Sequence, residues 1–170
     1  TSYVGGLVGS NQGVLLRVYA TGSVTASTST GIGGLIGDNQ MADSVTASFY
    51  NTQTTGQASA VGTGSASGVT GLTTAQMRDG STASGGFYAL ASAAGWDFTT
   101  VWARPNAVAS QSSDGQLHYA ELYAVSGVVG ANATGTMVYG DSVPTLTSAS
   151  YGTGSGHGDV VPTNPTYTPA

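Results

Sequence analysis

The chain has 170 residues, with 27 glycines, no cysteine, no lysine and a formal net charge of −5; 6% of its residues are charged and 39% are hydrophobic. This composition excludes disulfides and thiolate metal sites, a nucleic-acid-binding surface and a membrane-spanning run of roughly 18 apolar residues. The abundant Gly, Ser, Thr, Ala and Val instead predict closely packed β-structure.

A repeated unit occupies the first 56 residues. Residues 5–12 and 33–40 both read Gly-Gly-Leu, an apolar residue, Gly, a polar residue and Asn-Gln. A fixed period of roughly 20 to 50 residues is typical of stacked repeats, so we expect equivalent strands to pack on one another. The predicted stacking residues are Gly5, Gly6, Leu7, Asn11, Gly33, Gly34, Leu35 and Asn39, with the two asparagines hydrogen-bonded along the stack. The alternative is a pair of hairpins in a Gly-rich sandwich.

A further strand follows each of these units. Aligning Tyr19 with Phe49 gives a longer spacing than the Gly-Gly-Leu units show, so the second unit has about two extra residues near 41–43. Residues 53–71 are Gly, Ser, Thr and Ala with little patterning, which predicts a surface loop. Residues 73–78 predict one short helical turn that begins with a capping Thr.

Large aromatic side chains gather in residues 86–125. Residues 95–98 and 101–102 alternate as a strand does. Bulky rings at the end of a stack of small residues predict a cap that protects the strand edges from aggregation. The alternative is a sugar-stacking platform. The candidate residues for the cap or for glycan contact are Trp96, Trp102, Tyr119 and Tyr123.

The last 45 residues read as the start of another β-rich module. Residues 136–147 contain a strand, a Tyr-Gly-Asp turn and a second strand, and prolines make the tail extended. An extended tail can add a strand to the open sheet edge of a neighbouring copy. The predicted assembly residues are Val138, Tyr139, Leu146, Pro162 and Pro165.

These patterns divide the chain into three predicted segments. Stacked coils occupy residues 1–56, a loop, a helical turn and an aromatic cap occupy residues 57–125, and an incomplete module occupies residues 126–170. The predicted fold class is all-β, built as a solenoid. Because the sequence begins inside a repeat, we expect a fragment or a processed product.

The order of four motifs resembles a known family. The two Gly-Gly-Leu units are followed by residues 71–77, by Gly-Trp-Asp-Phe at 95–98 with Val-Trp at 101–102, and by Val-Tyr-Gly-Asp at 138–141. This order resembles GLUG-type repeats followed by a YDG/MBG module, in exoproteins of the filamentous-haemagglutinin-like, two-partner-secretion class. The resemblance implies a right-handed parallel β-helix, located outside the cell or on the cell surface of a Gram-negative bacterium.

The ionisable residues show no catalytic or metal-binding pattern. Glycan cleavage requires two carboxylates across a groove, whereas Asp38 and Asp43 lie in a predicted turn. His118 and His157 are far apart and have no clustered acid or cysteine. We therefore expect no enzymatic activity, no cofactor and no metal.

The function expected from the sequence is structural. The chain is predicted to be an adhesive segment of a secreted bacterial surface fibre, used for attachment or for biofilm matrix assembly. Its expected partners are copies of itself or surface glycans, through weak multivalent contacts. A carbohydrate-binding module that uses exposed aromatic rings is the alternative, and a Thr-rich ice-binding face is a third hypothesis.

Overall fold

The computed structural model describes residues 2–27, 30–106 and 116–126. The chain forms two units, Thr1–Asp97 with Arg104–Ala120 and Phe98–Ala103 with Glu121–Ala170. Among the described residues, the first unit contains strands β1 to β10 and helices α1 and α2, and the second contains β11, β12 and α3. The predicted C-terminal module, with Val138, Tyr139, Leu146, Pro162 and Pro165, lies outside the described residues.

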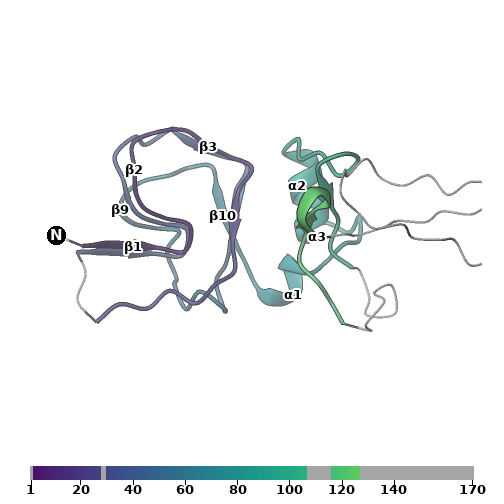
Figure 1. Cartoon of the computed structure of the whole chain (residues 1–170), viewed down its shortest axis with the longest axis horizontal. Helices are drawn as coiled ribbons and strands as arrows, with labels where there is room; N and C mark the ends of the chain where they lie inside the picture. The colour runs from purple at the N-terminus through teal and green to yellow at the C-terminus, as the bar shows by residue number, and fades with distance from the viewer. Residues whose placement is uncertain (1, 28–29, 107–115, 127–170) are drawn as a thin grey trace, which may run out of the picture. The chain divides into compact units, whose positions relative to one another are not determined.

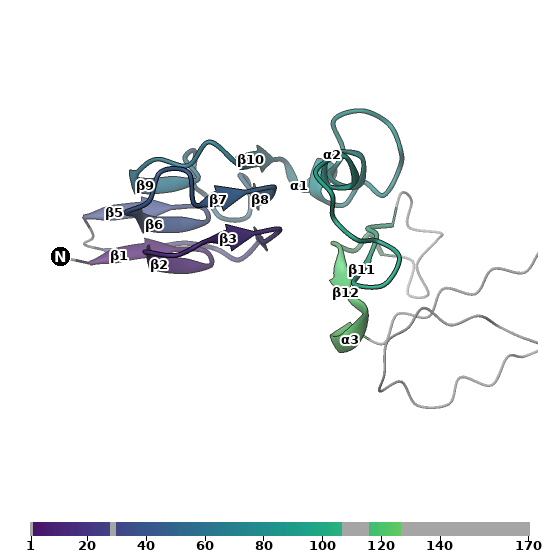
Figure 2. The ribbon, with the colours of Figure 1, turned by 90° about the horizontal axis from the view of Figure 1, so that it is seen from above.

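Ten short strands of the described part of the first unit lie in three rows, one above another (Figures 1 and 2). The first row is β1 (Tyr3–Gly5), β2 (Val8–Asn11), β3 (Leu15–Leu16) and β4 (Tyr19–Ala20). The second row is β5 (Gly31–Gly33), β6 (Ile36–Asn39), β7 (Val45–Thr46) and β8 (Ser48–Asn51), and the third is β9 (Val61–Gly64) and β10 (Val69–Leu72). All the pairings between these rows are parallel, in sheets β1-β5, β2-β6-β9, β3-β7 and β4-β8-β10.

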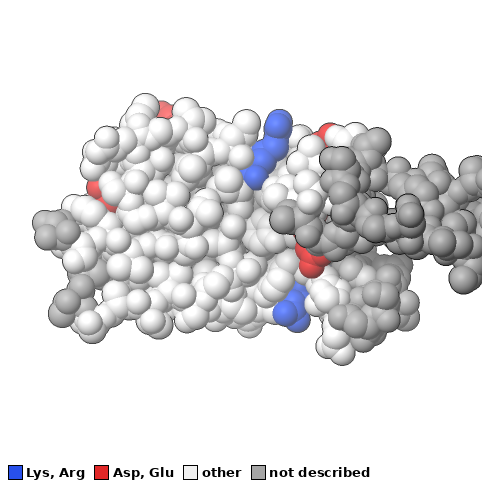
Figure 3. All heavy atoms as spheres, viewed as in Figure 1, with Lys and Arg blue, Asp and Glu red and all other residues white. Residues whose placement is uncertain are grey.

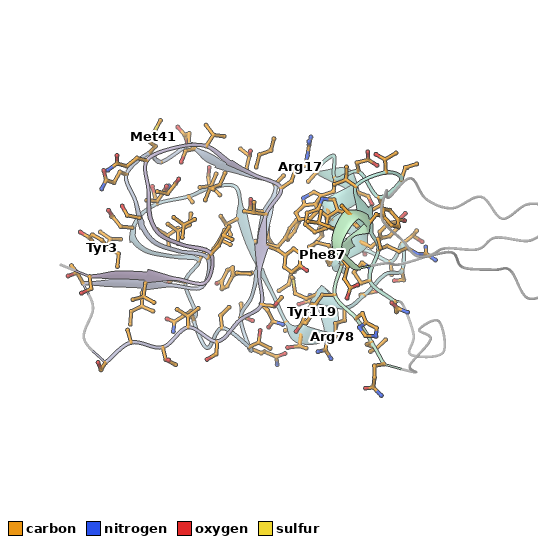
Figure 4. All side chains as sticks on the ribbon, viewed as in Figure 1. Tyr3, Arg17, Met41, Arg78, Phe87 and Tyr119 are labelled. Atoms are coloured by element: carbon orange, nitrogen blue, oxygen red, sulfur yellow. The ribbon has the colours of Figure 1, made fainter. Side chains whose placement is uncertain are left out.

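The repeat in the sequence sets the register between the first two rows. Asn11 pairs with Asn39 at a separation of 28 residues, whereas Tyr19 pairs with Phe49 at a longer sequence separation. Both pairings confirm the alignment predicted from the sequence. The extra residues of the second row lie at the exposed corner 41–43, which Met41 marks in Figure 4.

The second row forms the core because it lies between the other two rows. Leu35, Ile36 and Val45 are each 0% exposed, and the smaller side chains of the third row pack against them. Complete burial of a side chain such as Leu or Ile contributes about 1.5–3 kcal/mol. Tightly stacked rows of small residues thus bury enough apolar surface to hold the strands together.

Tyr50 fills the interior beside Gly34. A Cβ atom on Gly34 would lie 2.2 Å from Cδ2 of the Tyr50 ring, so no larger residue fits there. The Tyr50 hydroxyl donates a hydrogen bond to the Ala58 carbonyl oxygen at 2.8 Å. Burial raises the pKa of this phenol above its ordinary value of 10.0, because a charged phenolate is poorly solvated in the interior.

The predicted fold class, an all-β right-handed parallel β-helix with an aromatic end cap, is wrong. The strands are two to four residues long and form separate sheets of two or three strands, and helices α1 (Thr74–Met77), α2 (Phe87–Ala93) and α3 (Tyr123–Ser126) follow them. Closely spaced glycines keep the strands short because they lack side chains to pack. The α2 sequence contains Ala and Leu and no β-branched residue, which favours a helix.

Two local predictions also need correction, and one is confirmed. Residues 53–71 are not a simple surface loop, because β9 and most of β10 lie within them and pair with β6 and β8. Residues 95–98 are not a strand; Gly95, at φ +80°, turns the chain at the end of α2. The helical turn over residues 73–78 is confirmed as α1, where Thr73 and Gln76 form a capping box.

The second unit contains a short hairpin-like pair of strands. In this pair, β11 (Trp102–Ala103) lies antiparallel to β12 (Glu121–Leu122). The Tyr123 N–H donates a hydrogen bond to the Val101 carbonyl oxygen at 3.0 Å. This bond continues the pairing into the start of α3.

Candidate functional site

The candidate site is the outer edge of the first row, formed by β1 to β4. Leu7 is 45% exposed, Val14 74% and Leu16 50%, whereas Leu35, the counterpart of Leu7 in the second row, is fully buried. Figure 2 shows β1, β2 and β3 on one side of the stack of rows. Large apolar side chains exposed along a strand edge are typical of a surface that pairs with another chain segment.

In the first unit, two contacts between successive rows use the same backbone arrangement, in which one carbonyl oxygen accepts from two neighbouring N–H groups. The Leu35 carbonyl oxygen accepts hydrogen bonds from the N–H groups of Leu7 and Val8, at 2.9 and 3.2 Å. The Ala60 carbonyl oxygen accepts from Leu35 and Ile36 in the same way, at 2.9 and 3.0 Å. At the first row the equivalent acceptor is the Leu7 carbonyl, which has no further row to accept from in the described part of the chain.

A ladder of side-chain amides runs through the rows beside this edge. Asn11 Nδ2 donates to Asn39 Oδ1 at 2.8 Å, as the sequence predicts. Asn39 Nδ2 in turn donates to the carbonyl oxygens of Met41 and Ser65, at 2.8 and 2.7 Å. Both asparagines are buried, at 5% and 4% exposure. Buried amides stabilise a structure only when they are hydrogen-bonded, and these are.

The two ends of the amide ladder differ. At the third row the position that pairs with Asn39 is Gly64, which has no side chain, so the ladder ends on the Ser65 carbonyl. At the first row Asn11 Oδ1 accepts the Gly13 N–H at 3.2 Å, within the same turn. A carbonyl oxygen has two lone pairs, so Asn11 retains acceptor capacity on the side of the open edge.

The amide ladder makes a measurable contribution to stability. We expect Asn39→Ala to lower the free energy of unfolding by about 2–3 kcal/mol, because it removes a buried amide that donates to the Met41 and Ser65 carbonyls and accepts from Asn11 Nδ2. Chemical denaturation followed by circular dichroism measures this loss. Gln12, which follows Asn11, is exposed, so Gln12→Ala is the matched control and should change stability by less than about 0.5 kcal/mol. Equal losses in the two variants would contradict the prediction.

Four aromatic rings, three of them buried and one half-buried, form a cluster on the side of β4 and β8. Phe87 lies edge-on to Tyr19, Phe49 and Trp96, with ring centroids 5.8, 5.0 and 5.3 Å away. Trp96 is 5% exposed, and its Nε1 donates to the Ala47 carbonyl oxygen at 2.8 Å. The predicted end cap is therefore wrong, because these rings cover a side of the rows, where Figure 4 shows Phe87.

The other predicted aromatic residues lie in different surroundings. Tyr119, half-buried in the first unit, is held by Asn51 Nδ2 on its hydroxyl oxygen at 3.1 Å and by the Arg78 guanidinium 4.7 Å from its ring centroid. Figure 4 shows Arg78 and Tyr119 side by side. Trp102 and Tyr123 belong to the second unit and are both half-buried. The four predicted rings are therefore divided between the two units.

Backbone strain accompanies the aromatic cluster. Arg17 and Ala47 have φ of 55° and 50° at equivalent places, between β3 and β4 and between β7 and β8. A left-handed conformation costs a non-glycine residue about 1–2 kcal/mol. Holding this turn lets the Ala47 carbonyl accept the Trp96 hydrogen bond.

Relief of this strain should stabilise the chain. We expect Ala47→Gly to raise the free energy of unfolding by about 0.5–1 kcal/mol, since the gain in φ freedom exceeds the entropic cost of glycine. The control, Ala89→Gly in the middle of α2, should have the opposite sign, with a loss of about 0.5–1 kcal/mol. Thermal denaturation measures both, and destabilisation by Ala47→Gly would contradict the expectation.

Charged groups do not gather into a reactive site among the described residues. No group of three or more His, Cys, Asp and Glu side chains able to hold a metal ion occurs in that part of the chain. The face seen in Figure 3 is mostly uncharged over the described atoms. Asp38 is buried and accepts a hydrogen bond from Gln40 Nε2 at 3.1 Å. Asp38 therefore lies within strand β6 and not in the predicted turn.

Comparison with known proteins gives a partial match. No protein-family model matches the chain, and no solved structure matches it. The chain is 40% identical over 103 residues to a protein of Evansella cellulosilytica named a Gly-rich membrane protein, a match that covers 58% of this chain and 10% of that protein. In the described residues, no helix has the length and hydrophobicity needed to cross a membrane. The chain is thus similar, over part of its length, to a small part of a Gly-rich protein named for a membrane location.

Proposed function

We propose that this chain is a structural and adhesive segment of a bacterial cell-surface protein. The observation that carries the proposal is the first-row edge, where three large apolar side chains are exposed next to the second row, whose Leu35, Ile36 and Val45 are fully buried. A rigid stack with one open edge is suited to contacts with other chain segments. Its role would be cell-surface attachment or assembly of the biofilm matrix.

The proposed location is the outside of the cell. The similar protein of Evansella cellulosilytica is named a membrane protein, which supports a place at the cell envelope. The absence of cysteine from the sequence suits an exported chain, because no disulfide can form before it reaches its destination. The resemblance to GLUG-type surface exoproteins supports the same location.

The carbohydrate-binding alternative receives little support from the aromatic residues. Stacking on a sugar requires an accessible ring face, and Trp96 is 5% exposed with its Nε1 already donating to Ala47. One face of Tyr119 is covered by the Arg78 guanidinium. We therefore propose contacts between chain segments as the adhesive mechanism.

A bead assay tests the adhesive role. Beads coated with the full chain should cluster with one another or bind bacterial cells, and the triple variant Leu7→Ser, Val14→Ser and Leu16→Ser should reduce this binding at least several-fold. Met41→Ser, a change at an exposed apolar residue away from the first-row edge, is the matched control and should leave binding unchanged. Negative-stain electron microscopy with mass analysis shows whether assemblies form. Beads that bind neither cells nor one another would refute the proposed function.

A further inference from the structure

We propose that the first-row edge accepts a further strand unit of the Gly-Gly-Leu-x-Gly-x-Asn-Gln type, stacked in parallel, and that the rows extend in this direction alone. This inference rests on the proposed structural role and names the partner of its edge. The partner is defined by its chemistry, as a segment with paired glycines, an apolar residue and an asparagine at the spacing of residues 5–12.

The backbone geometry identifies this type of partner. Two successive row-to-row contacts place two neighbouring N–H groups on one carbonyl oxygen, at Leu35 and at Ala60. The Leu7 carbonyl is the next acceptor in that series. Glycine is required beside it, because a Cβ atom on Gly5 would lie 2.2 Å from the Val8 carbonyl oxygen, 2.6 Å from Gly37 N and 2.7 Å from Ile36 Cα. A partner that repeats the contact therefore needs glycine at its own equivalent position.

The side chains select the same partner. Asn11 Nδ2 donates towards the second row, to Asn39 Oδ1, so an incoming asparagine in the same register would donate its own Nδ2 to Asn11 Oδ1. An incoming leucine at the equivalent position would cover Leu7, just as the first row covers the fully buried Leu35. Apolar burial and the amide hydrogen bond thus favour one register.

The opposite edge lacks these features. Gly64 occupies the ladder position of the third row, and the Ser65 carbonyl ends the ladder. The exposed large hydrophobic residues of the described rows are Leu7, Val14, Leu16 and Met41, none of which belongs to β9 or β10. Extension by a unit of this type is therefore expected at β1 to β4 and not at the third row.

The test uses the full chain with a copy of residues 3–30 inserted ahead of Tyr3. Hydrogen exchange followed by mass spectrometry should show at least about tenfold slower exchange for the copied Leu7 and Val8 amides than in a control with the same 28 residues scrambled. The melting temperature should also rise by several degrees above that of the scrambled control. A second variant, with Asn→Ala at the copied Asn11, should lose part of the protection.

Each other outcome would overturn the inference. Exchange in the inserted copy as fast as in the scrambled control would mean that the edge does not accept this unit. The same conclusion would follow if the intact copy unfolded the parent chain and the scrambled copy did not. A dimer of the unmodified chain that the insertion abolishes would mean that the edge pairs with a second copy instead. Failure of the bead assay with a protected insertion would refute the proposed function alone, whereas bead clustering with an unprotected insertion would refute this inference alone.

Discussion

Replacing Phe87 with alanine should lower the free energy of unfolding by about 3–5 kcal/mol. The side chain is 0% exposed and contacts three aromatic rings from β4, β8 and the segment after α2. Removing it leaves a cavity that rigid neighbouring rings fill poorly, and it loses the edge-to-face contacts. Urea denaturation followed by circular dichroism gives the difference between wild type and variant.

Two variants serve as controls for the Phe87 cavity. Phe87→Leu keeps most of the apolar volume and should cost less than half as much as Phe87→Ala. Leu7→Ala removes a comparable side chain at a position that is 45% exposed, so it should change stability by about 1 kcal/mol or less. A cost for Phe87→Ala below that of Leu7→Ala would show that the aromatic cluster does not hold α2 against the strands.

Substituting alanine for Gly33 should destabilise the rows by about 3 kcal/mol. The added Cβ atom would lie 2.0 Å from the Ile36 carbonyl oxygen, 2.7 Å from the Ala60 carbonyl oxygen and 2.7 Å from Gly62 N. All three atoms belong to the backbone of the second and third rows, so no side-chain rotation relieves the clash. Thermal and urea denaturation of the purified variant measure the loss.

The control for Gly33 is another glycine of the first unit. A Cβ atom on Gly22 would meet nothing within 4 Å, and its φ lies outside the left-handed region. Gly22→Ala should therefore be neutral or stabilise by up to about 1 kcal/mol, because alanine restricts the unfolded chain. Similar losses in both variants would mean that the close approach of the rows at Gly33 contributes little.

The pairing of the first two rows was predictable because matched residues at a fixed spacing identify which residues face each other. Asn11 with Asn39 and Tyr19 with Phe49 follow directly from that alignment. The third row carries no such signal. Val61 pairs with Ile36, but this parallel pairing is made by the backbone and needs only small side chains in the third row. The sequence of β9 and β10 therefore has the pattern of a loop.

Burial was harder to predict than pairing. The two Gly-Gly-Leu units have nearly the same local sequence, yet Leu7 is 45% exposed and Leu35 is 0% exposed, because exposure depends on the place of each unit among the rows. The burial of Trp96 was hard to predict for the same reason. Its surroundings come from Tyr19 and Phe49, which lie far away in the sequence, so alternation within residues 95–102 could not reveal them.

The corner formed by residues 41–43 has a consequence for how such sequences diversify. The second row is longer than the first at this point, yet the strands before and after the corner remain paired with the first row. Length variation is tolerated because the corner is exposed and the strands on either side are anchored independently. Insertions acquired there during evolution, or grafted there by design, could carry a new recognition loop without altering the stacked framework.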